Sequence, residues 1–268
     1  MKSSPLTLTG IADEAGKSIE KQIQAHQELD WTSIELRLIN DLNATWSLPE
    51  DQFQHAAEKI EEAGLTVTGF GSAIGNWSRS ITDDFSIDLN ELKTAIPRMQ
   101  RFNTKFIRTM SWLGDGVDES DWKKESIRRY KELARLAEDS GIYLAHENCT
   151  GWGGLNPQNM NTFIEEIGSD NVVTLYDIGN VVSHGSDPWD FYQRLNKEYI
   201  AYVHIKDARR NPEGGGSSHF TYPGEGDAMV KEILHDLAKT GYKGVVSIEP
   251  HIANIIHKAD ENTANENV

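Results

Sequence analysis

The sequence predicts an α/β fold, a (β/α)8 barrel that forms a single domain over residues 1–268. Eight short apolar runs alternate along the chain with amphipathic helical patterns, which favours parallel strands joined through βαβ units. Several of the helical patterns end in glycine just before the next apolar run. The length of 268 residues also suits one closed barrel.

The predicted strands are rich in β-branched and apolar residues. They cover residues 7–12, 33–37, 66–71, 105–110, 142–147, 172–177, 201–206 and 245–249. The clearest helical patterns between them cover 18–30, 49–64 and 121–141. Gly64, Gly141 and Gly241 each stand between a helical pattern and a strand, as the C-terminal cap of a helix requires.

An open doubly wound sheet is the main alternative architecture. Such a sheet normally carries a glycine-rich phosphate-binding turn after its first strand. The segment at that position, "GIADEAGKS" (10–18), fits neither the G-x-G-x-x-G pattern nor the P-loop pattern. The closed barrel is therefore favoured.

The end of the chain fits the repeating pattern less well. Residues 250–268 follow the eighth predicted strand and end in the polar run "ADENTANENV". They carry no strong apolar stripe with a helical period. We therefore expect the eighth helix to be short or incomplete, with a polar tail over about 258–268.

Composition excludes several classes of function. The net charge of −16 disfavours a protein that follows a nucleic-acid backbone, and no run approaches the ~20 apolar residues of a membrane span. The N-terminal "MKSSPLTLTG" lacks the apolar core of a signal peptide, so we expect a cytoplasmic protein. Cys149 is the only cysteine, which excludes an intrachain disulfide and a cysteine-rich metal site.

Four potential metal ligands stand at the ends of four consecutive predicted strands: Glu147, Asp177, His204 and Glu249. In a barrel these ends converge on one mouth, where active sites of this fold lie. Three carboxylates that converge repel one another, and a divalent cation removes that conflict. One such residue alone is usually a helix cap, an ion pair or a core histidine. Four on adjacent strands predict a shared site for one ion, first Mn²⁺, with Mg²⁺, Co²⁺ or Zn²⁺ as alternatives.

These strand ends read "HEN" (146–148), "YDIGN" (176–180), "HIKDAR" (204–209) and "SIEP" (247–250). In this order they resemble the xylose-isomerase-like TIM barrel superfamily, and within it the sugar phosphate isomerase/epimerase branch. The resemblance spans essentially the whole chain. It implies that the four residues above are the metal ligands, and that Glu147 and Glu249 also move protons.

The resemblance implies a metal-dependent isomerase or epimerase of a small keto-sugar, sugar phosphate or cyclitol ketone. The metal would stabilise an enediolate while one glutamate removes a proton and the other returns it. The alternatives are a dehydratase or lyase on an inosose or keto-sugar acid, and a sugar-binding barrel without activity. The superfamily's DNA-repair endonuclease needs extra histidines, and Asn180 and the net charge disfavour it. We expect a homo-oligomer, a dimer or tetramer.

Five residues are candidates for contact with the substrate: Glu35, Trp112, Asn180, Lys206 and Arg210. Arg210 stands six residues after His204, where related ketose epimerases carry a substrate-contacting arginine; a solvated basic loop is the alternative. Asn180 replaces a histidine of several relatives. Trp112 is the preferred aromatic wall, whereas Trp77 and Trp152 are assigned to packing.

Two interpretations of Glu35 are open. It either binds a substrate hydroxyl or pairs with Arg37 or Arg108, and the sequence does not decide between them.

Overall fold

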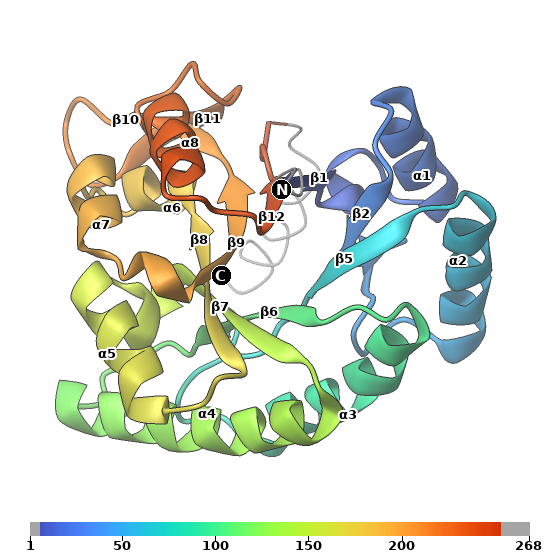
Figure 1. The fold of residues 1–268 in the computed structure, drawn as a ribbon. Coiled ribbons are helices and arrows are strands. Elements are labelled where there is room, and N and C mark those ends of the chain that lie inside the picture. The colour runs from blue at the N-terminus through green and yellow to red at the C-terminus, as the bar shows by residue number, and fades with distance from the viewer. Residues whose placement is uncertain (1–5, 253–268) are drawn as a thin grey trace, which may run out of the picture.

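The computed structural model describes residues 6–252, and in these residues eight parallel strands form a nearly closed barrel with helices outside it (Figure 1). Their order around the barrel is β1-β12-β9-β8-β7-β6-β5-β2. Their bounds are Thr7–Gly10 (β1), Ser33–Leu36 (β2), Thr66–Gly71 (β5), Phe106–Ser111 (β6), Tyr143–Gly151 (β7), Val172–Asp177 (β8), Ile200–Ile205 (β9) and Val245–Ile248 (β12). A bridge between Ile11 and Glu35 connects the ends of β1 and β2. All eight predicted strands are present.

The helices pack around the outside of these strands. Their bounds are Ile19–Glu28 (α1), Glu50–Glu62 (α2), Ser86–Arg101 (α3), Glu119–Ser140 (α4), Pro157–Ile167 (α5), Ile178–Ser183 (α6), Pro188–Arg194 (α7) and Val230–Lys239 (α8). Gly64, Gly141 and Gly241 have φ angles of +68°, +68° and +85°, the left-handed conformation expected where these helices end. The predicted eighth helix and polar tail lie outside the described residues.

Short strand pairs and 3₁₀ turns lie outside the eight-stranded sheet. Two antiparallel pairs join Leu38–Ile39 (β3) to Leu42–Asn43 (β4), and Asp207–Arg210 (β10) to Ser217–Thr221 (β11). Three 3₁₀ turns cover Ala12–Glu14, Trp152–Gly154 and Lys197–Tyr199. β7 continues to Gly151, four residues beyond its predicted end, because Gly151 still pairs with Ser111 of β6.

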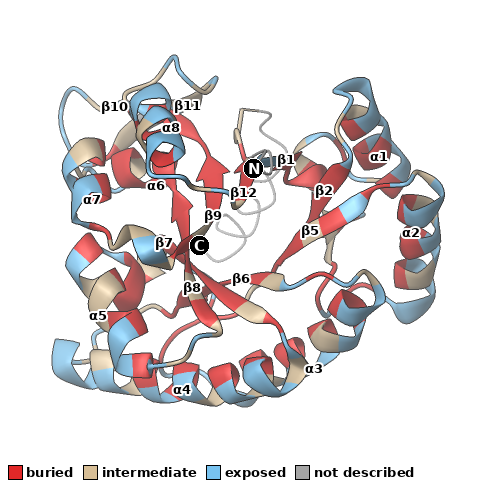
Figure 2. Ribbon diagram, in the orientation of Figure 1, coloured by how far each residue is buried: buried red, intermediate tan, exposed pale blue. Residues whose placement is uncertain are grey.

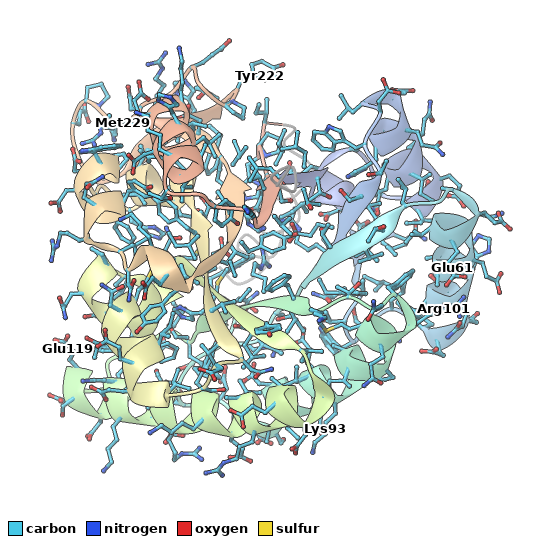
Figure 3. The ribbon with its side chains drawn as sticks, in the orientation of Figure 1. Glu61, Lys93, Arg101, Glu119, Tyr222 and Met229 are labelled. Atoms are coloured by element: carbon cyan, nitrogen blue, oxygen red, sulfur yellow. The ribbon has the colours of Figure 1, made fainter. Side chains whose placement is uncertain are left out.

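The core lies between the barrel strands and the helices. Figure 2 shows the strands largely buried, with the exposed stretches on the outer faces of the helices. On that outer surface Arg101 of α3 and Glu61 of α2 form an ion pair of 3.1 Å (Figure 3). None of the helices in residues 6–252 combines the length and apolarity that crossing a membrane requires.

A buried ionic network fixes the loop at residues 72–79, which follows β5 at the mouth of the barrel. Asp88 of α3 accepts hydrogen bonds from the backbone N–H of Gly75 (3.0 Å) and from the indole of Trp112 (2.8 Å). Arg79 pairs with both Asp88 and Glu91. The loop is therefore tied to α3 by charges that are themselves buried.

We expect Asp88→Asn to destabilise the protein by about 3 kcal/mol, because it leaves Arg79 buried with one charge partner fewer. Urea denaturation followed by circular dichroism measures this change. As the matched control, Glu62→Gln removes an exposed pair with Lys59 and is expected to leave the midpoint unchanged. Equal midpoints for the two variants would show that the Asp88 network does not stabilise the fold.

Candidate metal centre

The structure brings the four predicted metal ligands together at the mouth of the barrel. Glu147 lies in β7, Asp177 ends β8, His204 lies in β9 and Glu249 follows β12. These strands are consecutive in the sheet, and Asp177 stands directly beside His204 in the register. One ligand atom from each residue lies within 4.8 Å of the others, and all four residues are buried.

Each of these residues also turns one ligand atom toward the cluster: Glu147 Oε2, Asp177 Oδ2, His204 Nδ1 and Glu249 Oε2. Asp177 Oδ2 and Glu249 Oε2 lie 2.8 and 3.1 Å from the Lys206 ammonium, Glu249 Oε2 also lies 3.2 Å from His204 Nδ1, and Glu147 Oε2 lies 3.5 Å from Arg108. Three carboxylates buried this close together repel one another, which favours a further cation among them. Three carboxylate oxygens and one imidazole nitrogen are a donor set that Mn²⁺, Mg²⁺, Co²⁺ and Zn²⁺ all accept. The residues present therefore fit a divalent ion.

A second layer of hydrogen bonds orients these side chains. Glu35 accepts from His204 Nε2 at 3.1 Å and from the Tyr202 hydroxyl at 2.8 Å, which turns His204 Nδ1 toward the cluster. This carboxylate behind a histidine is typical of metal sites. Asn180 donates to Glu147 Oε1 at 2.9 Å.

Glu35 is fully buried behind His204 and is not among the residues that line the cavity described below. Its hydrogen bonds go to Tyr202 and His204 and not to Arg37 or Arg108, so the predicted arginine pairing is wrong. Its true partners lie more than 160 residues later in the chain, so the local sequence could not indicate them.

Lys206 lies inside the cluster. Its ammonium is 2.8 Å from Asp177 Oδ2, 3.1 Å from Glu249 Oε2 and 3.1 Å from Asn180 Oδ1. Gly179 makes room for it, because a Cβ at that position would approach Lys206 Cβ to 2.6 Å. Lysine and a divalent ion would therefore share the oxygens of Asp177 and Glu249.

Two buried arginines that sequence reasoning did not assign also reach the glutamates. Arg37, directly after β2, donates to Glu249 and is held by Asp13 on its other side. Arg108 of β6 lies 3.5 Å from Glu147 Oε2. The signal available in the sequence was an arginine within or directly after an apolar strand, "IELR" and "KFIR".

The two glutamates have opposite electrostatic surroundings. Burial raises the pKa of Glu147 to about 7; Arg108 opposes this rise, whereas Glu249 and Asp177 add to it. Burial also acts to raise the pKa of Glu249, but Lys206 and other nearby cations outweigh it and hold that pKa well below its usual range.

Burial would lower the pKa of His204, but Glu35 and Glu249 overcome it and raise the pKa to about 10 when no ion is bound. A proton held this firmly must leave before the nitrogen can ligate a metal, so the ion and the proton compete for this imidazole.

A cavity of about 340 Å³ opens above the cluster. Its lining residues come from the loops and strand ends at the mouth of the barrel: Arg37, Trp77, Arg108, Met110, Glu147, Cys149, Asn180, Ser183, His184, Lys206, Phe220, Glu249 and His251. Of the five predicted substrate contacts, Asn180 and Lys206 are among them.

Trp112 and Arg210 lie elsewhere. Trp112 is completely buried, because the chain takes a left-handed turn there (φ +58°) and the indole packs on Phe85 and Tyr130 in the core. Arg210 lies on the β10–β11 hairpin with 46% of its side chain exposed, 3.6 Å from Asp187. Trp112 is therefore not the predicted aromatic wall of this cavity, and Arg210 is not among the residues that line it.

Comparison with known proteins places this geometry in a family. Residues 23–267 match the family model described as xylose isomerase-like TIM barrel. The chain belongs to this family. The resemblance inferred from the four strand ends is thereby confirmed at the level of the superfamily.

The individual relatives share only a low sequence identity with this chain. An inosose dehydratase of Histophilus somni (strain 129Pt) is 29% identical over 159 residues, which cover 53% of each chain. The chain spans about half the length of the curated relatives it matches. Among solved structures, the IOLI protein with a bound zinc atom has a TM-score of 0.75 at 17% identity, covering 97% of this chain and 96% of that one. An L-ribulose 3-epimerase has a TM-score of 0.74 at 17% identity, covering 97% and 86%.

We expect the protein to retain about one Mn²⁺ per chain after loading and desalting, measured by mass spectrometry of the metal. Asp177→Asn, which preserves shape, and His204→Ala are each expected to lose most of it, because each removes one of the four ligand atoms that lie within 4.8 Å of one another. Circular dichroism checks that both variants fold.

The matched control is His55→Ala, which removes an exposed histidine on α2. Retention of the ion by both Asp177→Asn and His204→Ala would show that it binds elsewhere.

Proposed function

We propose that this protein is a divalent-metal-dependent enzyme that moves a proton beside the carbonyl of a small keto-sugar, sugar phosphate or cyclitol ketone. The observation that carries the proposal is the convergence of four buried potential ligand atoms, one each from Glu147, Asp177, His204 and Glu249, beneath a cavity. Two of these residues are glutamates that also line that cavity, where a substrate would meet them.

We assign a different role in this reaction to each side chain of the site. One of Glu147 and Glu249 removes the proton next to the carbonyl, and the other returns it to the opposite face or to the adjacent carbon. Lys206 offers its ammonium to a substrate oxygen at the floor of the cavity. Asn180 holds Glu147 in place through its 2.9 Å hydrogen bond. Glu147, Asp177, His204 and Glu249 would hold a divalent ion, which would supply Lewis-acid stabilisation of the negative charge that develops on the substrate.

Isomerisation or epimerisation is the reaction we favour, because two glutamates from different strands can serve two proton positions. The structural likeness to an L-ribulose 3-epimerase supports the fold on which such chemistry occurs. The ion we propose first is Mn²⁺, and the zinc in the IOLI structure supports a site for a divalent ion in this fold.

Dehydration is the second candidate, and a specific observation favours it. Half of the chain aligns with inosose dehydratases. The same proton removal would begin the reaction, after which a β-hydroxyl group leaves and a C=C bond conjugated to the carbonyl forms. Such a product absorbs in the near ultraviolet, whereas an epimer does not, so absorbance separates the two reactions.

We propose a small-molecule sugar substrate, no nucleic-acid or membrane partner, and assembly into a homodimer or homotetramer. A monomeric mass in light scattering would contradict the last point.

We expect Glu147→Gln and Glu249→Gln each to slow the exchange of substrate hydrogen with deuterated water by about 10²–10⁴-fold. Gln keeps the shape of the side chain but cannot take up the proton. Proton NMR of the Mn²⁺-loaded protein with a panel of keto-sugars and cyclitol ketones measures the exchange.

Glu62→Gln, an exposed position on α2, is the control and should exchange at the rate of the parent protein. If Glu249→Gln exchanged at that rate while retaining its metal, Glu249 would not be an acid or base in this reaction.

A further inference from the structure

Lys206 lies directly against the candidate metal ligands. Its ammonium has three N–H donors and three acceptors within hydrogen-bond distance: Asp177 Oδ2 at 2.8 Å, Glu249 Oε2 at 3.1 Å and Asn180 Oδ1 at 3.1 Å. Lys206 is buried, so these three oxygens take the place of water around its charge. Two of the three acceptors belong to carboxylates that would also hold a divalent ion.

The two arginines at the mouth of the barrel are placed differently. Arg37 donates to the other oxygen of Glu249, Oε1. Arg108 lies 3.5 Å from Glu147 Oε2, which is longer than a normal N–H···O hydrogen bond. Of these three buried cations, only Lys206 is within hydrogen-bond distance of candidate ligand atoms, and it contacts two of them.

A divalent ion and the ammonium cannot both bind Asp177 Oδ2 and Glu249 Oε2 without strong repulsion. An ion ligates carboxylate oxygens at about 2.0–2.2 Å, so it would lie close to an ammonium that already contacts the same two atoms. Two cations repel strongly in a buried site, where salt and water screen little. Binding of the ion therefore requires the ammonium to leave at least one of these oxygens.

Asn180 offers the ammonium an acceptor that does not belong to the candidate ligands. Its amide group donates to Glu147 Oε1 at 2.9 Å and to the backbone oxygen of Asn148 at 3.1 Å. Both amide hydrogens are thus used, which fixes the amide oxygen toward Lys206. Asn180 and Lys206 both line the cavity. An ammonium that leaves the two carboxylates can therefore keep this hydrogen bond and turn toward the cavity.

We propose that Lys206 is a built-in competitor of the divalent ion, which holds Asp177 and Glu249 in place and lowers the affinity of the site for the metal. On metal binding the ammonium gives up these carboxylates, keeps Asn180 Oδ1 as its acceptor and presents its freed donors to the cavity. Metal affinity and the position of the ammonium are thereby coupled. This inference rests on the metal-binding part of the proposed function and gives Lys206 and Asn180 a positioning role.

Lys206→Met tests the competition, because methionine keeps an unbranched apolar stem without the charge. We expect the variant to bind Mn²⁺ at least about ten-fold more tightly than the parent protein, measured by electron paramagnetic resonance of free Mn²⁺. The EDTA-treated variant is expected to unfold at a lower urea concentration than the EDTA-treated parent, because the buried carboxylates have lost a cation. Lys206→Gln, which keeps an N–H donor, is also expected to bind Mn²⁺ more tightly and serves if the methionine variant does not fold.

The matched control is Lys197→Met. Lys197 is half-buried, and its ammonium binds backbone oxygens, including that of Leu195 at 3.0 Å, instead of the candidate ligands. We expect this variant to bind Mn²⁺ with the affinity of the parent protein. A merely structural role for Lys206 would make Lys206→Met bind Mn²⁺ equally well or more weakly, whereas removal of a competing cation makes it bind more tightly.

Asn180→Ala tests the acceptor of the displaced ammonium. It is expected to weaken Mn²⁺ binding for two reasons, because the ammonium loses its remaining acceptor and Glu147 loses a hydrogen bond. Only the second reason applies in the Lys206→Met background, so the loss is expected to be smaller there. Equal losses in the two backgrounds would show that Asn180 does not receive the ammonium.

Mn²⁺ binding by Lys206→Met that is equal to or weaker than that of the parent protein would overturn the competition, and so would the absence of Mn²⁺ binding in both. These outcomes are separate from those of the proposed function. Tighter Mn²⁺ binding in Lys206→Met, without proton exchange on any ketone by the parent protein, would remove the function and keep the competition. Proton exchange by the parent protein, with unchanged Mn²⁺ affinity in Lys206→Met, would do the reverse.

Discussion

The compensation of buried charge at the mouth of the barrel is the constraint on which the rest of the structure depends. Glu35, Glu147, Asp177 and Glu249 are all buried there, and an uncompensated buried carboxylate is costly. Arg37, which follows β2, Arg108 of β6 and Lys206 lie against these carboxylates, and the Lys206 ammonium contacts both Asp177 Oδ2 and Glu249 Oε2. A divalent ion would replace part of this compensation, and the donor set of three carboxylates and one imidazole fits such an ion.

The barrel makes this concentration of charge possible. Parallel strands aim their C-terminal ends at one mouth, so residues from four strands that are adjacent in space but separated along the chain converge without a special loop. The apolar layer between strands and helices supplies the stability, and the loops at the mouth are secured by buried networks of their own, around Asp88 and around Asp207. The candidate site thus lies at the strand ends and their loops, whereas the apolar layer between strands and helices stabilises the fold. A rigid cavity with a charged floor and aromatic walls is the result.

Much of this could be predicted from the sequence, and the failures have physical reasons. All eight strands were predicted, because strands covered on both faces read as short apolar runs between capped helices. The candidate metal ligands followed from their positions at strand ends. Trp112 was misplaced because a left-handed turn directs its indole into the core. Arg210 lies near Asp187 with its side chain half exposed, although Phe220 of the same hairpin lines the cavity. Trp77 was assigned to packing but lines the cavity, and its position there depends on a loop whose anchors, Asp88 and Glu91, come from the following helix.

A crystal structure of the protein loaded with Mn²⁺, with data collected for anomalous scattering, tests the central claim most directly. We expect one anomalous peak at about 2.0–2.3 Å from Glu147 Oε2, Asp177 Oδ2, His204 Nδ1 and Glu249 Oε2, with the Lys206 ammonium moved away from at least one of the oxygens it contacts here. A structure with no peak among these four atoms, and with Lys206 still bridging Asp177 and Glu249, would contradict it. The buried charges would then be balanced by the chain's own cations alone.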